Sequence, residues 1–217
     1  MIRLHHVPQS RSFRILWLLE ELGLSYEVVE HSFFDKSLRG ADYLALSPAG
    51  RVPALEIDGR ALFESGAITQ YLCETRGALQ GAPAERPDWL EWLHFAETIA
   101  VHVANLTQQH VVLREDWMRS PTVMRLEAAR LLKTLEVVER GLSAEYILPS
   151  GFSAVDISVS YGALIGARFV QLDSLPQLRS WLARLAARPA FGRALARDGV
   201  SQIYTRDFYP APEPKNG

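Results

Sequence analysis

The amino-acid sequence predicts a small mixed α/β domain followed, after a short linker, by an all-helical domain. Three observations predict this class. A strand–helix–strand pattern opens the chain, an Asp-Gly hairpin and another helix follow it, and the segment beyond residue 87 shows helical periodicity without a convincing strand. The 217 residues, 48% of them hydrophobic, suit one large or two small domains with an ordinary core.

The opening pattern lies in residues 2–31. Residues 2–7 (IRLHHV) alternate as a short strand, and residues 25–31 (SYEVVEH) form a second one. Between them, apolar side chains recur at helical spacing on one face and Gly23 supplies a left-handed stop; the face consists of Ile15, Leu18, Leu19 and Leu22. Strand, helix and strand in this order favour parallel pairing through a right-handed crossover.

A hairpin and a helix complete the first domain. Asp58-Gly59 is a strong type I′ turn signal between residues 53–57 and residues 60–64. Residues 65–77 (SGAITQYLCETRG) then read as a helix that ends at its glycine.

The domain organisation follows from these elements. We expect an α/β domain over residues 1–77, a Gly/Ala/Pro-rich linker over residues 78–87 and a helical domain over residues 88–217. The helical domain should contain five helices, the first of them long and bent or broken.

Composition excludes several classes of function. The net charge of −2 shows no basic excess for nucleic acid or an acidic membrane, and charges interrupt every apolar run before the roughly 20 residues of a membrane span. Cys73 is the one cysteine, which excludes an intrachain disulfide and a dithiol redox motif. His94, His102 and His110 would stand roughly 12 Å apart along one helix, too far to share a metal. We expect a cytoplasmic protein without a metal.

Pro53 stands at the start of an otherwise good strand. Proline cannot donate a ladder hydrogen bond, so within sheets it is confined to strand starts, edges and bulges. If the Val52–Pro53 bond is cis, the backbone of Val52 could pair with an extended, peptide-like ligand. The alternative is a trans proline that begins the strand. Position alone favours trans, since only about 5–6% of such bonds are cis.

Glu64 and Ser65 mark the switch from strand to helix. A helix start offers free N–H groups and a positive dipole end to a carboxylate, and Glu64 could bind an ammonium group. A free α-amino-acid head carries both charges. The alternative is that Ser65 only caps the helix.

Ser10 and Ser12 lie in the first strand-to-helix turn, a usual place for a ligand group in α/β sheets. A hydroxyl there could donate a hydrogen bond to a thiolate and lower the pKa of that thiol. Helix capping is again the alternative.

Four segments in this order make the chain resemble a cytosolic glutathione S-transferase over nearly its whole length: SRSFRILWLLEELGLSYEVV, SPAGRVPAL, ESGAITQYL and SAVDISVS. The resemblance implies a thioredoxin-like N-terminal domain, an all-α C-terminal domain, a homodimer, and glutathione as cosubstrate. In SAVDISVS, Ser153 and Asp156 match the family's helix-capping box, which is a folding device.

Residue by residue, the resemblance implies a glutathione site. Pro53 is similar to the family's cis-proline, and the backbone of Val52 would pair with the cysteinyl part of glutathione. Glu64 and Ser65 match the pair that holds the γ-glutamyl head, and Arg51 is a further contact to a glutathione carboxylate.

The turn SRSFRILW looks like that of the serine-type bacterial and fungal members. Aligning Arg14 with their arginine places Ser10 at the catalytic hydroxyl, with Ser12 as the other candidate. The resemblance implies a transferase acting on small electrophilic or peroxide substrates. The alternatives are a glutathione-dependent peroxidase or disulfide reductase at the same site, and a non-catalytic binding protein. His102, Asn105 and Trp117 are candidates for the second-substrate pocket.

Overall fold

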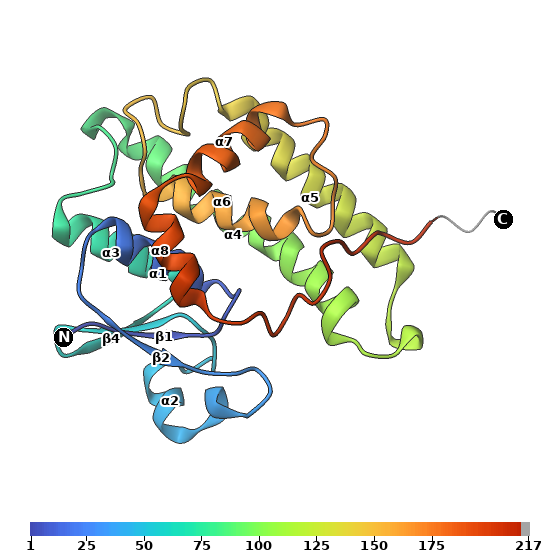
Figure 1. Ribbon diagram of the computed structural model, residues 1–217, viewed down its shortest axis with the longest axis horizontal. Helices are drawn as coiled ribbons and strands as arrows, with labels where there is room; N and C mark the ends of the chain where they lie inside the picture. Colours follow the sequence, from blue (N-terminus) through green and yellow to red (C-terminus); the bar gives the residue numbers. More distant parts are fainter. Residues whose placement is uncertain (214–217) are drawn as a thin grey trace. The chain divides into compact units, whose positions relative to one another are not determined.

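A computed structural model describes residues 1–213 of the chain. Its contacts divide into two compact units (Figure 1). The first comprises Met1–Pro83 together with Leu185–Ile203, and the second comprises Ala84–Arg184 with the segment that starts at Tyr204. No helix among the described residues has the length and apolar composition that crossing a bilayer requires.

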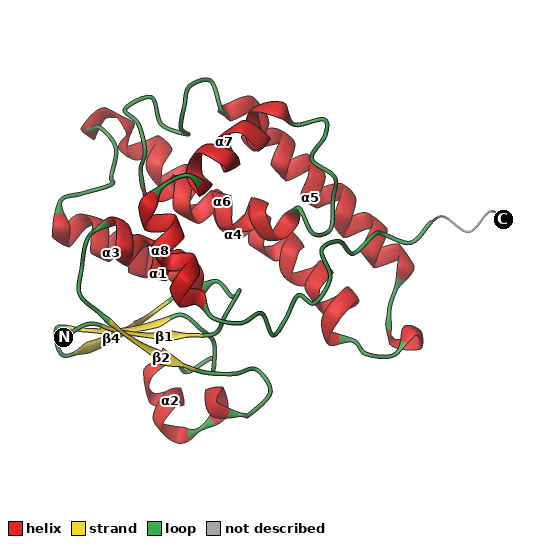
Figure 2. Cartoon of the chain, in the orientation of Figure 1, coloured by secondary structure: helices red, strands yellow, loops and turns green. Residues whose placement is uncertain are grey.

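The first unit contains a mixed four-stranded sheet in the order β2-β1-β3-β4 (Figure 2). β1 pairs parallel with β2 and antiparallel with β3, and β3 pairs antiparallel with β4. The parallel pair is the one that the strand–helix–strand pattern predicts. The strands are β1 (Arg3–His6), β2 (Glu27–Glu30), β3 (Ala54–Ile57) and β4 (Arg60–Phe63).

The hairpin between β3 and β4 turns at the predicted pair. Asp58 and Gly59 both have positive φ angles, 52° and 78°, as a type I′ turn requires. The turn brings the start of β3 opposite the end of β4, since Ala54 pairs with Phe63. The segments that precede β3 and follow β4 therefore lie close together.

Helices cover both faces of this sheet. Figure 1 places α1 (Ser12–Glu21) and α3 (Ser65–Arg76) on one face and the short α2 (Ala41–Leu46) on the other. A 3₁₀ turn, η1 (Ser37–Arg39), precedes α2. Every residue of α1 from Ser12 to Leu19 is buried, because this helix packs on the sheet, on α3 and on α8.

Helix α8 (Pro189–Asp198) packs on α1, although it follows the helical segment in the sequence. The ring of Phe191 meets the Trp17 ring edge-on at 4.9 Å between centroids. Arg188, just before the helix, forms a two-pronged ion pair with Glu21 at 2.7 and 2.8 Å. The contacts thus group residues 185–203 with the α/β unit, whereas the sequence places them in one helical domain over residues 88–217.

The second unit is helical. The 22-residue α4 packs against α5 and α6 and runs into a π-helical turn at Gln108–Val112, which matches the predicted break. Its α-helices are α4 (Arg86–Thr107), α5 (Pro121–Gly141), α6 (Ala154–Gly166) and α7 (Pro176–Ala186), with 3₁₀ turns η2 (Pro83–Glu85) before α4 and η4 (Asp116–Met118) before α5.

Helix α6 is the core of this unit and is buried on nearly all sides. Its capping box is the predicted one: Ser153 is the N-cap, and the Asp156 carboxylate accepts the backbone N–H of Ser153 at 2.9 Å. The same carboxylate accepts the indole N–H of Trp181 at 3.0 Å. The predicted folding role of this pair is confirmed.

Candidate functional site

A pocket in the first unit gathers residues from four segments: the turn before α1, the loop before β3, the end of β4 and the start of α3. It brings together all five residues that the sequence predicts to bind glutathione. Its lining consists of Arg11, Ser47, Ala49, Arg51, Val52, Pro53, Phe63, Glu64 and Ser65.

The loop before β3 presents Val52 to the pocket. The Val52–Pro53 bond is cis, the isomer that the resemblance implies and that position alone disfavours. The carbonyl of Arg51 accepts hydrogen bonds from Tyr43 Oη at 2.7 Å and Ser47 Oγ at 2.8 Å. Burial raises the pKa of Tyr43 to about 12, so its hydroxyl remains a donor at neutral pH. These two bonds hold the backbone just before Val52.

The start of α3 includes a backbone conformation that lowers the stability of the folded chain. Glu64 is the N-cap residue, with φ 71° and ψ 113°, and its side chain is exposed and makes no capping hydrogen bond. A non-glycine residue held at such a φ costs about 1–3 kcal/mol, and such residues cluster at functional sites. Ser65 is the first residue inside the helix rather than its cap. The capping alternative for Ser65 is therefore wrong.

The buried side chain of Arg14 holds the Ser65 hydroxyl by a hydrogen bond. This arginine of α1 is 1% exposed, and its Nη1 donates to Ser65 Oγ at 3.2 Å. Because Ser65 Oγ accepts this bond, the proton of its own hydroxyl is directed elsewhere and can be donated to a ligand. The guanidinium also adds positive charge to the positive end of the α3 dipole. The start of α3 is therefore suited to a carboxylate.

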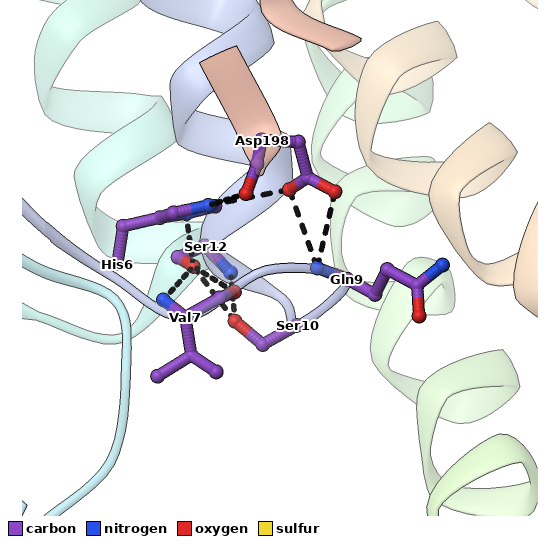
Figure 3. A network of polar contacts seen from close by, with 6 residues as sticks. All are labelled: His6, Val7, Gln9, Ser10, Ser12 and Asp198. Carbon is purple, nitrogen blue, oxygen red and sulfur yellow. Dashed lines mark hydrogen bonds and ion pairs between the residues drawn. The ribbon is translucent and has the colours of Figure 1, made fainter. Parts of the chain in front are cut away.

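The turn before α1 holds the two candidate serines (Figure 3). Ser10 Oγ and Ser12 Oγ lie 2.7 Å apart. Ser12 is fully buried, whereas Ser10 retains 8% exposure. Neither serine belongs to the pocket lining described above, although Arg11 between them does.

On the side away from Ser10, Ser12 contacts His6, and His6 contacts Asp198. No pattern in the sequence connects these two residues. His6 Nδ1 is 2.7 Å from Ser12 Oγ, and His6 Nε2 is 3.0 Å from the carbonyl oxygen and 3.2 Å from Oδ1 of Asp198. The Asp198 carboxylate also accepts the backbone N–H of Gln9 at 3.1 and 3.2 Å. The last residue of α8 is thus joined to the turn before α1 (Figure 3).

Comparison with known proteins identifies the family. The family model "Glutathione S-transferase, N-terminal domain" matches residues 1–74. Glutathione S-transferase 3 of Schizosaccharomyces pombe is 29% identical over 206 residues, 88% of this chain and 85% of that protein. A glutathione S-transferase of Silene vulgaris is 30% identical over 214 residues, 90% of this chain and 97% of that protein. The chain belongs to the glutathione S-transferase family.

A solved structure from the same family has the same fold. A glutathione transferase of Pseudomonas putida, with one glutathione disulfide bound per subunit, superposes with a TM-score of 0.80 at 27% identity and covers 91% of this chain and 92% of that one. The predicted fold, a thioredoxin-like N-terminal domain with a helical C-terminal domain, is confirmed, and the protein is an enzyme of the glutathione S-transferase family.

The residues suggested for a second-substrate pocket have other contacts in the helical unit. His102 Nδ1 lies 2.8 Å from Glu127 Oε2, and Asn105 donates to the same oxygen at 3.1 Å. Burial raises the pKa of Glu127, but hydrogen bonds from His102, Asn105 and Arg130 outweigh it, so the pKa lies below the ordinary value. Trp117 is 80% exposed on η4.

Within residues 1–213, no group of three or more possible metal ligands gathers.

The backbone cost at Glu64 gives a stability prediction. Glycine adopts a positive φ without steric cost, so Glu64→Gly should raise the free energy of unfolding by about 1 kcal/mol, net of the entropy that glycine adds to the unfolded chain. Glu64→Ala is the control, because it removes the carboxylate and keeps the strain. Urea denaturation measures both variants, and a glycine variant less stable than the alanine variant would contradict this account.

Proposed function

We propose that this protein is a serine-type glutathione transferase, related in its site to bacterial and fungal members, with glutathione bound in the pocket of the first unit. The single observation that carries the proposal is the convergence of Val52-Pro53 and Glu64-Ser65 on that pocket. In the proposed complex, the γ-glutamyl carboxylate meets Ser65 and its ammonium meets Glu64. The cysteinyl backbone pairs with Val52.

The charges of the pocket support this ligand. Glutathione carries two carboxylates, one ammonium group and a thiol. The pocket lining contains two arginines, Arg11 and Arg51, and one carboxylate, Glu64. Opposite charges placed in this way favour the ionised forms of ligand and protein groups alike. Arg51 is exposed and can reach toward the carboxylate that the start of α3 does not bind.

We assign the sulfur contact to Ser10. The Ser12 hydroxyl is wholly buried, whereas Ser10 retains some exposure, and among the described residues its hydroxyl hydrogen-bonds with Ser12 alone. Ser10 therefore keeps hydrogen-bonding capacity for a ligand. A thiolate stabilised there attacks an electrophilic carbon, forming the S–C bond as the leaving group departs. The homodimer expected from the resemblance is part of the same proposal.

Substitution of Ser10 tests the assignment. In Ser10→Ala we expect kcat/KM for conjugation of a chlorinated dinitrobenzene to fall about 100-fold, because the thiolate loses the hydrogen bond that the Ser10 hydroxyl donates to it. Affinity for S-methylglutathione should change little. Ser25→Ala, a change at an exposed serine of the same unit, is the control. Full activity in Ser10→Ala would contradict the assignment.

A second candidate is glutathione-dependent reduction of disulfides or peroxides at the same site. The glutathione disulfide in the Pseudomonas putida relative favours it. Side-by-side turnover of cumene hydroperoxide, a mixed disulfide and the chlorinated aromatic separates the two. We expect conjugation to be the fastest reaction. Faster reduction would favour the second candidate, and no turnover together with no glutathione binding would leave a binding protein that kept the fold.

A further inference from the structure

The hydrogen bonds behind Ser10 join four side chains in one path, with further bonds from Ser12 to the backbone of Val7 and from Asp198 to the backbone of Gln9. The path runs from Ser10 through Ser12 to His6 and ends at Asp198, with steps of 2.7, 2.7 and 3.2 Å (Figure 3). All four residues belong to the first unit. Ser12 and His6 are fully buried, and Asp198 is 6% exposed. Ser10, which is 8% exposed, is the more accessible end of the path.

The donor and acceptor chemistry of the groups on this path indicates which of its atoms carry protons. A carbonyl oxygen can only accept, so His6 Nε2, which faces the carbonyl and the carboxylate of Asp198, carries a proton. In neutral His6, Nδ1 is then bare and accepts from the Ser12 hydroxyl at 2.7 Å, which is the shorter of that hydroxyl's two acceptor contacts, the other being the Val7 carbonyl oxygen at 3.3 Å. Ser12 Oγ in turn accepts the N–H of Val7 at 3.3 Å and the hydroxyl of Ser10. Both of its lone pairs are then in use.

This arrangement leaves Ser10 as an acceptor toward a ligand. Its proton points to Ser12, and its oxygen accepts the backbone N–H of Ser12 at 3.3 Å. One lone pair remains, and a lone pair suits a thiol S–H rather than a thiolate. The same path with a proton on both nitrogens of His6 is reversed. Nδ1 then donates to Ser12, Ser12 donates to Ser10, and the Ser10 hydroxyl donates outward to an anion.

We propose that His6, held by Asp198, is the acceptor of the glutathione thiol proton, which reaches it through Ser10 and Ser12. In one concerted step the S–H bond breaks as a bond forms to Ser10 Oγ. The Ser10 proton passes to Ser12, and the Ser12 proton passes to His6 Nδ1. The products are a thiolate that accepts from Ser10 and an imidazolium beside the Asp198 carboxylate. After conjugation expels chloride, the proton passes back along the path to Ser10 and from there to water, so that chloride and a hydrated proton leave along with the thioether.

Other charged groups around β1 have separate partners. Glu56 on β3 contacts His5, Arg14 on α1 contacts Ser65, and Arg197 on α8 contacts Glu20. Glu30, the register partner of His6 on β2, is exposed. The charged group that contacts His6 among the described residues is Asp198.

His5 provides a matched control. It precedes His6 on β1, is similarly buried and also contacts a carboxylate, that of Glu56 at 3.1 Å. Its side chain points to the opposite face of the sheet, and its other ring nitrogen contacts His31 at 2.9 Å rather than a serine. A general loss of stability from a buried histidine substitution should affect both positions, whereas a relay should depend on His6 alone.

The test compares His6→Asn with His5→Asn. Asparagine can accept from Ser12 but cannot take up a proton. We expect His6→Asn to lower kcat/KM for conjugation about 100-fold at neutral pH, within the range for a general base. The ultraviolet titration of the bound thiol should move to higher pH, and the deficit should shrink as pH rises because the thiol then ionises without the relay. His5→Asn should keep the wild-type titration and rate.

The inference rests on the proposed function, and binding of S-methylglutathione separates the two. A wild-type protein that does not bind it, or a fully active Ser10→Ala, overturns the proposed function. A His6→Asn variant that binds it with wild-type affinity and keeps the wild-type titration and rate overturns the relay alone. If His6→Asn does not fold, Asp198→Asn takes its place, with the same direction expected and an unchanged thiol titration overturning the relay.

Discussion

The buried hydroxyl of Ser12 is the interaction on which the site depends. It hydrogen-bonds with Val7 just after β1, with His6 at the end of that strand and with Ser10 in the turn. These contacts occupy its hydrogen-bonding capacity and fix the turn before α1 in one arrangement. Since His6 also contacts Asp198, the same hydroxyl connects the turn to the end of α8. Without it, Ser10 would have no defined direction for its own proton.

Two energetic costs meet at the other end of the site, at the start of α3. Arg14 is a guanidinium withdrawn from water, and Glu64 is a non-glycine residue with positive φ. Burying a charge and holding such a φ both lower the stability of the folded chain. Both features are suited to a ligand with a carboxylate and an ammonium group, because Arg14 supports Ser65 and the unusual φ places Glu64 at the pocket. In the proposed account, the site thus combines a charged end with an end that transfers a proton.

Local signals in the sequence account for much of this structure. The pair Asp58-Gly59 favours a tight hairpin turn, and that turn brings the segments of Val52 and Glu64 close together. The packing of α8 on α1 and the contact between His6 and Asp198 are different, because both join residues far apart in the sequence, 167 positions for Glu21 and Arg188 and 192 for His6 and Asp198. Helix periodicity shows that α8 has an apolar face, but it does not show which unit covers that face. A histidine on a short strand likewise gives no sign of the carboxylate that a distant helix brings to it.

The central claim is that one glutathione spans both ends of the site, with its sulfur at Ser10. A crystal structure of the complex with glutathione tests this most directly. The account predicts the γ-glutamyl carboxylate within about 3 Å of Ser65 Oγ, the cysteinyl backbone paired with Val52 and the sulfur in contact with Ser10 Oγ. A glutathione bound in this pocket with its sulfur turned away from Ser10, or one bound elsewhere on the chain, would contradict it.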